Sequence, residues 1–200
     1  MTSESPDDGI VGSDAVPGGA GSGGRDGGKA ERHHVPRGSM AVHEPAPGRP
    51  DPVEVLVEQG RTRVPELVPV RYARMLVSTF TFFRGAAAVM AADLGAQPRS
   101  DLHVQLCGDA HLANFGGFAA PDRTLVFDVN DFDETIPGPF EWDVKRLVAS
   151  FVVAGRERGF SAQRCRDLVL RCVRSYQEAM SAFAGMTRLG VWYERLDAEA

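Results

Sequence analysis

The first 50 residues limit the possible folds of this chain most strongly, because they contain almost no large apolar side chains. Gly, Pro, Ser and Asp dominate residues 1–50. Such a segment cannot bury enough apolar surface to offset the conformational entropy lost on ordering. We therefore predict a disordered leader over residues 1–50 and a folded domain within residues 51–200.

The remaining composition is that of a globular protein in a reducing compartment. The hydrophobic share is 43% and the formal net charge is −5, which predicts neither nucleic acid nor anionic membrane as a partner. No apolar run approaches the roughly 20 residues that cross a bilayer, and the N-terminus does not resemble a secretory signal. Three cysteines without paired spacing favour free thiols. We expect a cytoplasmic protein.

Apolar periodicity predicts an α+β domain that is mainly helical. Helices are expected over residues 53–59, from an N-cap at Thr79 to Gly95, after PGPFEW, and after an N-cap at Ser161. Alternating residues predict strands over 102–107 and 124–129, with APDR as a turn between them. We expect these strands to form a short hairpin at the active site.

Residues 107–134 crowd metal-capable and proton-capable side chains into a short segment. Anions packed this densely repel one another unless they face water, a cation or separate directions. The segment therefore hints at a cation site. Its members are Asp109, His111, Asn114, Asp128, Asp131 and Asp133.

Phosphoryl transfer uses a carboxylate that orients the attacking hydroxyl, together with oxygen ligands for Mg²⁺. Kinase-like catalytic loops supply an Asp followed five residues later by an Asn, and Asp109 and Asn114 have this spacing. A second Asp then approaches the metal from the end of a later strand. Asp128 is the first choice, and Asp131 and Asp133 are close alternatives.

The text GDAHLANF resembles the HGDxHxxN loop of aminoglycoside-phosphotransferase-like kinases, with Cys107 where that family has His. This resemblance implies that His111 positions the catalytic turn beside Asp109. It also implies that Asp143, in FEWDVKRL, braces the loop from the following helix.

Residues 33–195 resemble a bacterial family named domain of unknown function 2252. The matching text includes VPELVPVRYARM, FFRGAAAVMAADL, QLCGDAHLANFG and FDVNDFDETIPGPFEWDVKRLVAS. The resemblance covers nearly everything outside the leader. It implies no established reaction.

A kinase also needs a Gly-rich phosphate loop and a strand lysine, and neither precedes the catalytic loop here. The only lysines are Lys29, in the leader, and Lys145, which follows the motifs. We expect the nucleotide-gripping lobe downstream of residue 200. The chain would then be a partial, C-lobe-like half of a kinase-like domain that is inactive alone.

Simpler interpretations exist for several of these residues. Asp131, Asp133 and Glu134 can form a solvated acidic turn. Arg84 can bind a nucleotide phosphate or pair with a carboxylate. Arg146 is expected to form a surface or inter-helix ion pair.

The leading hypothesis is a Mg²⁺- and ATP-dependent phosphotransferase acting on a hydroxyl of an unknown small-molecule or protein acceptor. Asp109 would be the base and His111 its neighbour, while Asn114 and Asp128 would hold Mg²⁺ with help from Asp131 or Asp133. The alternatives are a metal-dependent phosphoesterase, because GDAH also resembles the Asp-x-His ligands of calcineurin-like phosphatases, and a noncatalytic binding or regulatory module. The oligomeric state stays open.

Overall fold

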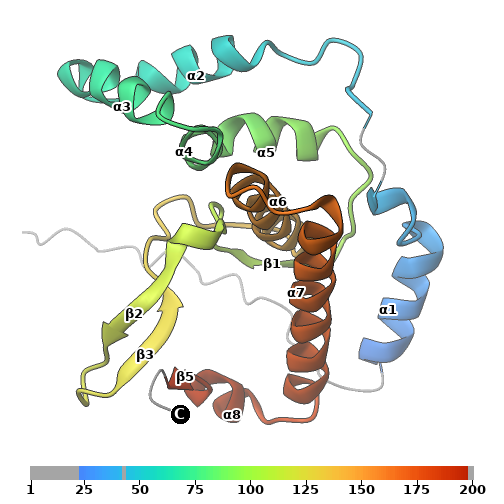
Figure 1. The fold of residues 1–200 in the computed structure, drawn as a ribbon. Helices are drawn as coiled ribbons and strands as arrows, with labels where there is room; N and C mark the ends of the chain where they lie inside the picture. Colours follow the sequence, from blue (N-terminus) through green and yellow to red (C-terminus); the bar gives the residue numbers. More distant parts are fainter. Residues whose placement is uncertain (1–22, 42–43, 198–200) are drawn as a thin grey trace, which may run out of the picture.

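The computed structural model describes residues 23–41 and 44–197, which form an α+β fold (Figure 1). The helices are α1 (Gly23–His34), α2 (Pro52–Gly60), α3 (Val68–Met75), α4 (Thr79–Gly85), α5 (Ala87–Gly95), α6 (Glu141–Glu157), α7 (Ala162–Phe183) and α8 (Arg188–Tyr193). Short 3-10 turns are η1 (Ser39–Ala41), η2 (Pro65–Leu67) and η3 (Leu112–Asn114). The strands are β1 (His103–Leu106), β2 (Phe115–Ala119), β3 (Leu125–Val129), β4 (Ile136–Pro139) and β5 (Leu196–Asp197).

Helix α6 lies at the centre of the fold. Helices α4 and α5 contact it on one side and α7 packs against it on another, while α2 and α3 form the outer layer (Figure 1). Its first turn is held by Glu141, whose carboxylate accepts hydrogen bonds of 2.7 Å from both the N–H and the hydroxyl of Ser100. Both side chains are buried. This contact ties the start of α6 to the segment that enters β1.

Side-chain caps define several helix ends near the predicted positions. The Asp51 carboxylate accepts hydrogen bonds from the N–H groups of Val53 and Glu54 at the start of α2. Ser161 caps α7 by accepting from the N–H of Arg164 at 3.2 Å. These caps satisfy amide groups that have no partner within a helix.

The single helix expected over residues 79–95 is instead two helices. The N-cap of the first is Ser78, one residue before the predicted Thr79. The helical conformation is interrupted at Ala86 (φ −110°, ψ 33°). Arginine side chains bind carbonyl oxygens beside the break: Arg146 Nη2 lies 2.9 Å from the oxygen of Phe83, and Arg71 Nη2 lies 2.6 Å from that of Gly85. These tertiary contacts satisfy the carbonyl groups without a continuous helix.

The predicted pairing of the two strands was wrong. Strand β1 pairs antiparallel with β4, with Leu106 opposite Ile136, and β3 pairs with β2 and β5. The turn over residues 120–123 joins β2 to β3, and Arg123 adopts a φ of 69° there. Strand β2 has the sequence FGGFA and β4 has IPGP, so glycine and proline conceal both strands from a propensity argument.

Part of the expected leader is ordered in the structure. Residues 1–22 lie outside the described residues, but residues 23–34 form α1. Glu31 accepts a hydrogen bond of 2.9 Å from the N–H of Asp101, Val35 is buried, and Arg49 pairs with Asp93. Contacts with residues far along the chain therefore stabilise a segment whose own composition provides little apolar surface.

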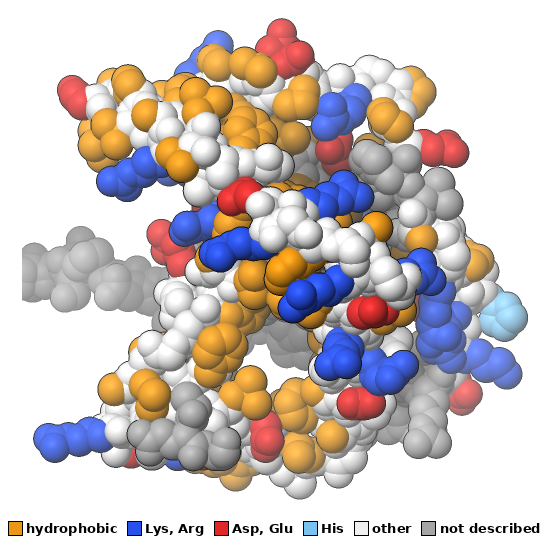
Figure 2. All heavy atoms as spheres, viewed as in Figure 1, with side chains coloured by type: hydrophobic (Ala, Val, Ile, Leu, Met, Phe, Trp, Pro, Cys, Tyr) orange, Lys and Arg blue, Asp and Glu red, His pale blue; other side chains and the backbone are white. Residues whose placement is uncertain are grey.

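Large apolar side chains remain exposed on the C-terminal elements. Trp192 is 82% exposed and Tyr193 72%, and Figure 2 shows hydrophobic side chains around the open space between the β2–β3 hairpin, α7 and α8. None of the helices in the described ranges is long and apolar enough to cross a membrane. Within these ranges all three cysteines are free thiols.

Candidate active site around the 107–114 loop

The second residue of the loop between β1 and η3, Gly108, is a glycine that no other residue can easily replace. Gly108 has a φ of +85°, and a Cβ there would overlap the carbonyl group of Glu134. L-residues rarely adopt this backbone conformation. Gly108 thus lets the loop pass directly against the segment that follows β3.

Asp143 holds this loop from the first turn of α6. Its two carboxylate oxygens accept hydrogen bonds from the N–H groups of Cys107, at 2.7 Å, and Gly108, at 3.1 Å. Burial raises the pKa of Asp143, these two hydrogen bonds oppose the shift, and the charge of Asp109 adds to it. Asp143 thus fixes the start of the loop to α6.

Asn114 connects the loop to the acidic segment after β3. Its Nδ2 donates to the carbonyl oxygens of Asp109, at 3.0 Å, and Asp131, at 2.6 Å, while its Oδ1 accepts from the N–H of Asp131 at 3.0 Å. The residue is only 5% exposed. The amide therefore has an internal role in joining two segments, and Oδ1 keeps one lone pair beyond that contact.

Asp109 forms an ion pair with Arg146 of α6. Nε and Nη2 of Arg146 each lie 2.6 Å from Oδ1 of Asp109, and both side chains are largely shielded from solvent. Arg146 was expected at the surface or between helices, but it is buried and its partner lies on the loop. One signal was present in the sequence: Arg146 follows Asp143 by three residues, which places both on one face of α6.

His111 lies on the other side of Asp109. Its Nε2 is 3.7 Å from Asp109 Oδ2, its ring meets Phe80 edge to face, and its Nδ1 has no hydrogen-bond partner within the described residues. Burial lowers the pKa of His111; Asp109 opposes that shift, while the charges of Arg146 and Arg84 add to it. The neutral imidazole is therefore favoured in this environment.

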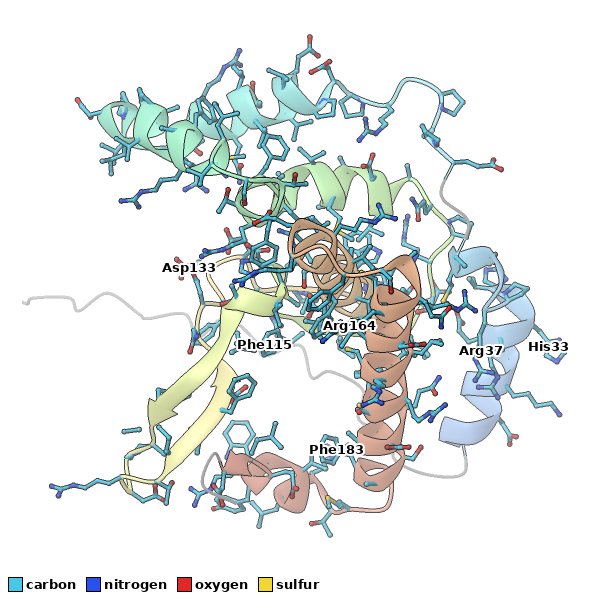
Figure 3. The ribbon with its side chains drawn as sticks, viewed as in Figure 1. His33, Arg37, Phe115, Asp133, Arg164 and Phe183 are labelled. Carbon is cyan, nitrogen blue, oxygen red and sulfur yellow. The ribbon has the colours of Figure 1, made fainter. Side chains whose placement is uncertain are left out.

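Three predicted metal ligands, Asp128, Asp131 and Asp133, are all exposed. The first lies on β3 and the other two lie on the segment that follows it. Asp128 lies on β3 opposite Gly116, and its carboxylate accepts from the N–H of Val129. The Asp131 carboxylate accepts from the N–H of Asp133 at 3.2 Å, and Figure 3 shows Asp133 at the outer edge of its loop. Among the described residues, no group of three or more His, Cys, Asp or Glu side chains could hold a metal ion.

The charges of Asp109 and Asp131 nevertheless act on the same neighbours. Burial raises the pKa of the Cys107 thiol and of the Glu134 carboxyl group, and both aspartates add to each shift. Asp133 contributes at Glu134 as well. The negative charges of the 107–114 loop and of the segment after β3 therefore act together on Cys107 and Glu134.

A cavity of about 560 Å³ opens beside the loop, within the range of small-ligand pockets. Its lining includes Cys107 and Ala110, which flank Asp109, together with Asp128 and Asp143. Apolar side chains such as Leu147 form its walls, and neither Asp109 nor Asn114 is among its lining residues. Residues of the loop and two of the predicted acidic residues, Asp128 and Asp143, therefore line the same cavity.

Two arginines near the loop differ in their bonding. Arg84 is exposed at the end of α4, and its guanidinium makes no ion pair within the described part of the chain. Arg71, which sequence reasoning missed, donates to Gln59 and Gly85, while its buried Nη1 lacks a partner among the described residues. Burial, with a smaller contribution from Arg63, lowers the pKa of Arg71.

Comparison with protein families matches residues 63–200 to the family described as "Uncharacterized protein conserved in bacteria (DUF2252)". Comparisons with curated proteins and with solved structures gave no match. The matched span includes the 107–114 loop, the acidic segment and α6. Since it covers more than half of the chain, this protein belongs to that bacterial family.

Proposed function

We propose that the 107–114 loop and the acidic segment after β3 form a site for Mg²⁺-dependent phosphoryl transfer from ATP to an acceptor hydroxyl. The observation that carries this proposal is the double anchoring of the loop. Asp143 binds its first two amide groups, and Asn114 links its end to Asp131. Positioning of reacting groups is the main contribution a protein makes to this reaction.

The donor set suits Mg²⁺ in kind. Mg²⁺ prefers oxygen ligands and is commonly bound by one or two carboxylates together with phosphates and water. Asp128 and Asp131 offer exposed carboxylates, and Asn114 Oδ1 has one lone pair beyond its bond to Asp131. These residues would hold the ion together with the nucleotide phosphates, which supply the remaining ligands.

Asp109 would accept the acceptor's proton through Oδ2, because Oδ1 is bound by Arg146. In the transfer, the hydroxyl oxygen bonds to the γ-phosphorus as the bond from that phosphorus to the β,γ-bridging oxygen breaks, which yields ADP and a phosphate ester. Bound Mg²⁺ would neutralise charge on the phosphates. Arg84, whose guanidinium is unpaired within the described residues, is suited to a phosphate oxygen.

A noncatalytic binding role is the second candidate. The Asp109 carboxylate is engaged by Arg146, and the Asn114 amide bonds to backbone groups on both sides. Together with the lack of a three-residue metal group among the described residues, this internal pairing favours a structural role for both side chains. The phosphoesterase hypothesis has no such specific support.

Calorimetric titration of the longest natural form of this protein with ATP, with and without Mg²⁺, tests the proposal. We expect nucleotide binding that requires Mg²⁺ and weakens at least about tenfold in Asp128→Asn, since a metal-bound carboxylate is lost. Asp167→Asn, an exposed change on α7, is the matched control and should bind as the unmodified chain does.

Each other outcome contradicts the proposal. Nucleotide binding that is absent, or that is independent of metal, argues for the noncatalytic role. Metal-dependent hydrolysis of p-nitrophenyl phosphate without nucleotide would favour a phosphoesterase.

A further inference from the structure

A second cavity, of about 490 Å³, is bounded by α4, α5, α6 and η1, and Arg146 is among its lining residues. Figure 1 places α4 and α5 along one side of α6, where these helices meet. The walls are mainly apolar and include Phe82, Val89, Leu94, Val153 and Met40. A cavity of this size and lining suits a small organic ligand.

The charged residues of the cavity wall differ in what they contact. Arg146 is engaged by Asp109 and by the carbonyl oxygen of Phe83. Asp93 is paired with Arg49, whose Nη2 lies 2.8 Å from Asp93 Oδ2. These groups are already neutralised within the protein and present little net charge to a ligand.

Lys145 is the exception. It is half-buried on α6, and within residues 23–41 and 44–197 its ammonium group makes no hydrogen bond or ion pair. The nearby Glu141 carboxylate is bound at both oxygens by Ser100. Burial lowers the pKa of Lys145, and the charge of Glu141 opposes that shift. An anion next to Lys145 would offset the desolvation of its charge.

We propose that this cavity binds a small amphiphile with one negative charge, of the medium-chain carboxylate class, with its alkyl chain among the apolar side chains and its head group at Lys145 Nζ. The wall is mainly apolar and its other charged residues, Asp93 and Arg146, are paired, so Lys145 supplies the one unpaired cation that the described lining residues offer to such a ligand. A neutral hydrocarbon would leave the ammonium unpaired, and a dianion would carry excess charge into an apolar site. This inference is independent of the phosphotransfer proposal.

Calorimetric titration of the 200-residue chain with decanoate tests the inference. We expect one site per chain, about tenfold or greater weakening in Lys145→Met, and most of the affinity retained in Lys145→Arg. Lys29→Met changes an exposed lysine on α1 and serves as the matched control. Decan-1-ol should bind the unmodified chain about as weakly as decanoate binds Lys145→Met.

The apolar half of the site has its own test. Affinity should rise several-fold for each pair of methylene groups from hexanoate to decanoate, because each group leaves water. Val153→Phe should reduce the binding of every carboxylate from hexanoate to decanoate. Circular dichroism reports whether the helices of this variant persist. If that variant does not fold, the chain-length series still decides.

Three results would overturn the inference. One is equal decanoate affinity in Lys145→Met and the unmodified chain. Another is the binding of many decanoate molecules to each chain, which is how a detergent binds. The third is self-association of the chain that decanoate does not affect and Val153→Phe abolishes, which would make a second copy the occupant.

Discussion

Arg146 and Asp109 join helix α6 to the 107–114 loop through an ion pair whose shortest distances are 2.6 Å. Nε and Nη2 of Arg146 contact the same oxygen, Oδ1, so that Oδ2 faces His111 Nε2 at 3.7 Å. Arg146 also donates to the carbonyl oxygen of Phe83 and lies over its ring, 4.4 Å from the centroid. A single side chain thus connects α6, α4 and the candidate base.

Removal of Arg146 should therefore cost much more stability than removal of a surface arginine. We expect Arg146→Met to lower the free energy of unfolding by about 3–5 kcal/mol, because it leaves Asp109 without its partner in a shielded place. The exposed Arg156 on the same helix is the control, and Arg156→Met should stay within about 0.5 kcal/mol. Urea unfolding measures both. Similar values for the two variants would show that the ion pair contributes little.

Gly108→Ala should destabilise the loop by about 2 kcal/mol or more, because φ is positive there and a Cβ meets the Glu134 backbone. Gly95→Ala is the matched control: it has open space around its Cβ position and should be neutral or stabilising by up to about 1 kcal/mol. Thermal unfolding of the two variants would distinguish them. Equal melting temperatures would mean that the loop relaxes around the new methyl group.

His111 should make stability depend on pH. Its pKa in the folded protein is lowered below the ordinary 6.5, so the unfolded chain binds a proton at a pH where the folded chain does not. Stability is therefore lost as pH falls below about 6.5, by up to about 1.4 kcal/mol per pH unit until the folded pKa is reached.

Urea unfolding between pH 7.5 and 5 tests this dependence. His111→Gln should lose less stability than the unmodified chain over the range, whereas His103→Gln, exposed on β1, should follow the unmodified chain. A steep loss that persists in His111→Gln would assign the effect to other groups.

Asn114 and Asp128 should separate stability from ligand binding. Asn114→Ala removes partners from three backbone groups, so we expect a loss of about 2–4 kcal/mol in unfolding free energy. Asp128→Asn changes an exposed side chain and should leave stability within about 0.5 kcal/mol while reducing Mg²⁺-dependent nucleotide binding. Paired unfolding and calorimetric measurements check both. A strongly destabilised Asp128→Asn would remove the distinction.

Features that depend on sequence neighbours could be predicted well. The cap at Ser161, the turn over residues 120–123 and the start of α6 follow from residues within a few positions of one another. The candidate loop was recognisable for the same reason, since Asp109, His111 and Asn114 lie within six consecutive positions. Whether those residues perform phosphoryl transfer stays a prediction.

Local sequence patterns therefore indicate most helices and the set of reactive side chains. Strand pairing, the helix break at Ala86 and the partners of the candidate residues depend on how distant segments pack. Asn114 bonds across 17 positions to Asp131, and Arg146 across 37 to Asp109 and 63 to Phe83. The physical reason is that such partners are selected by packing of distant segments, for which neighbouring residues carry no periodic signal.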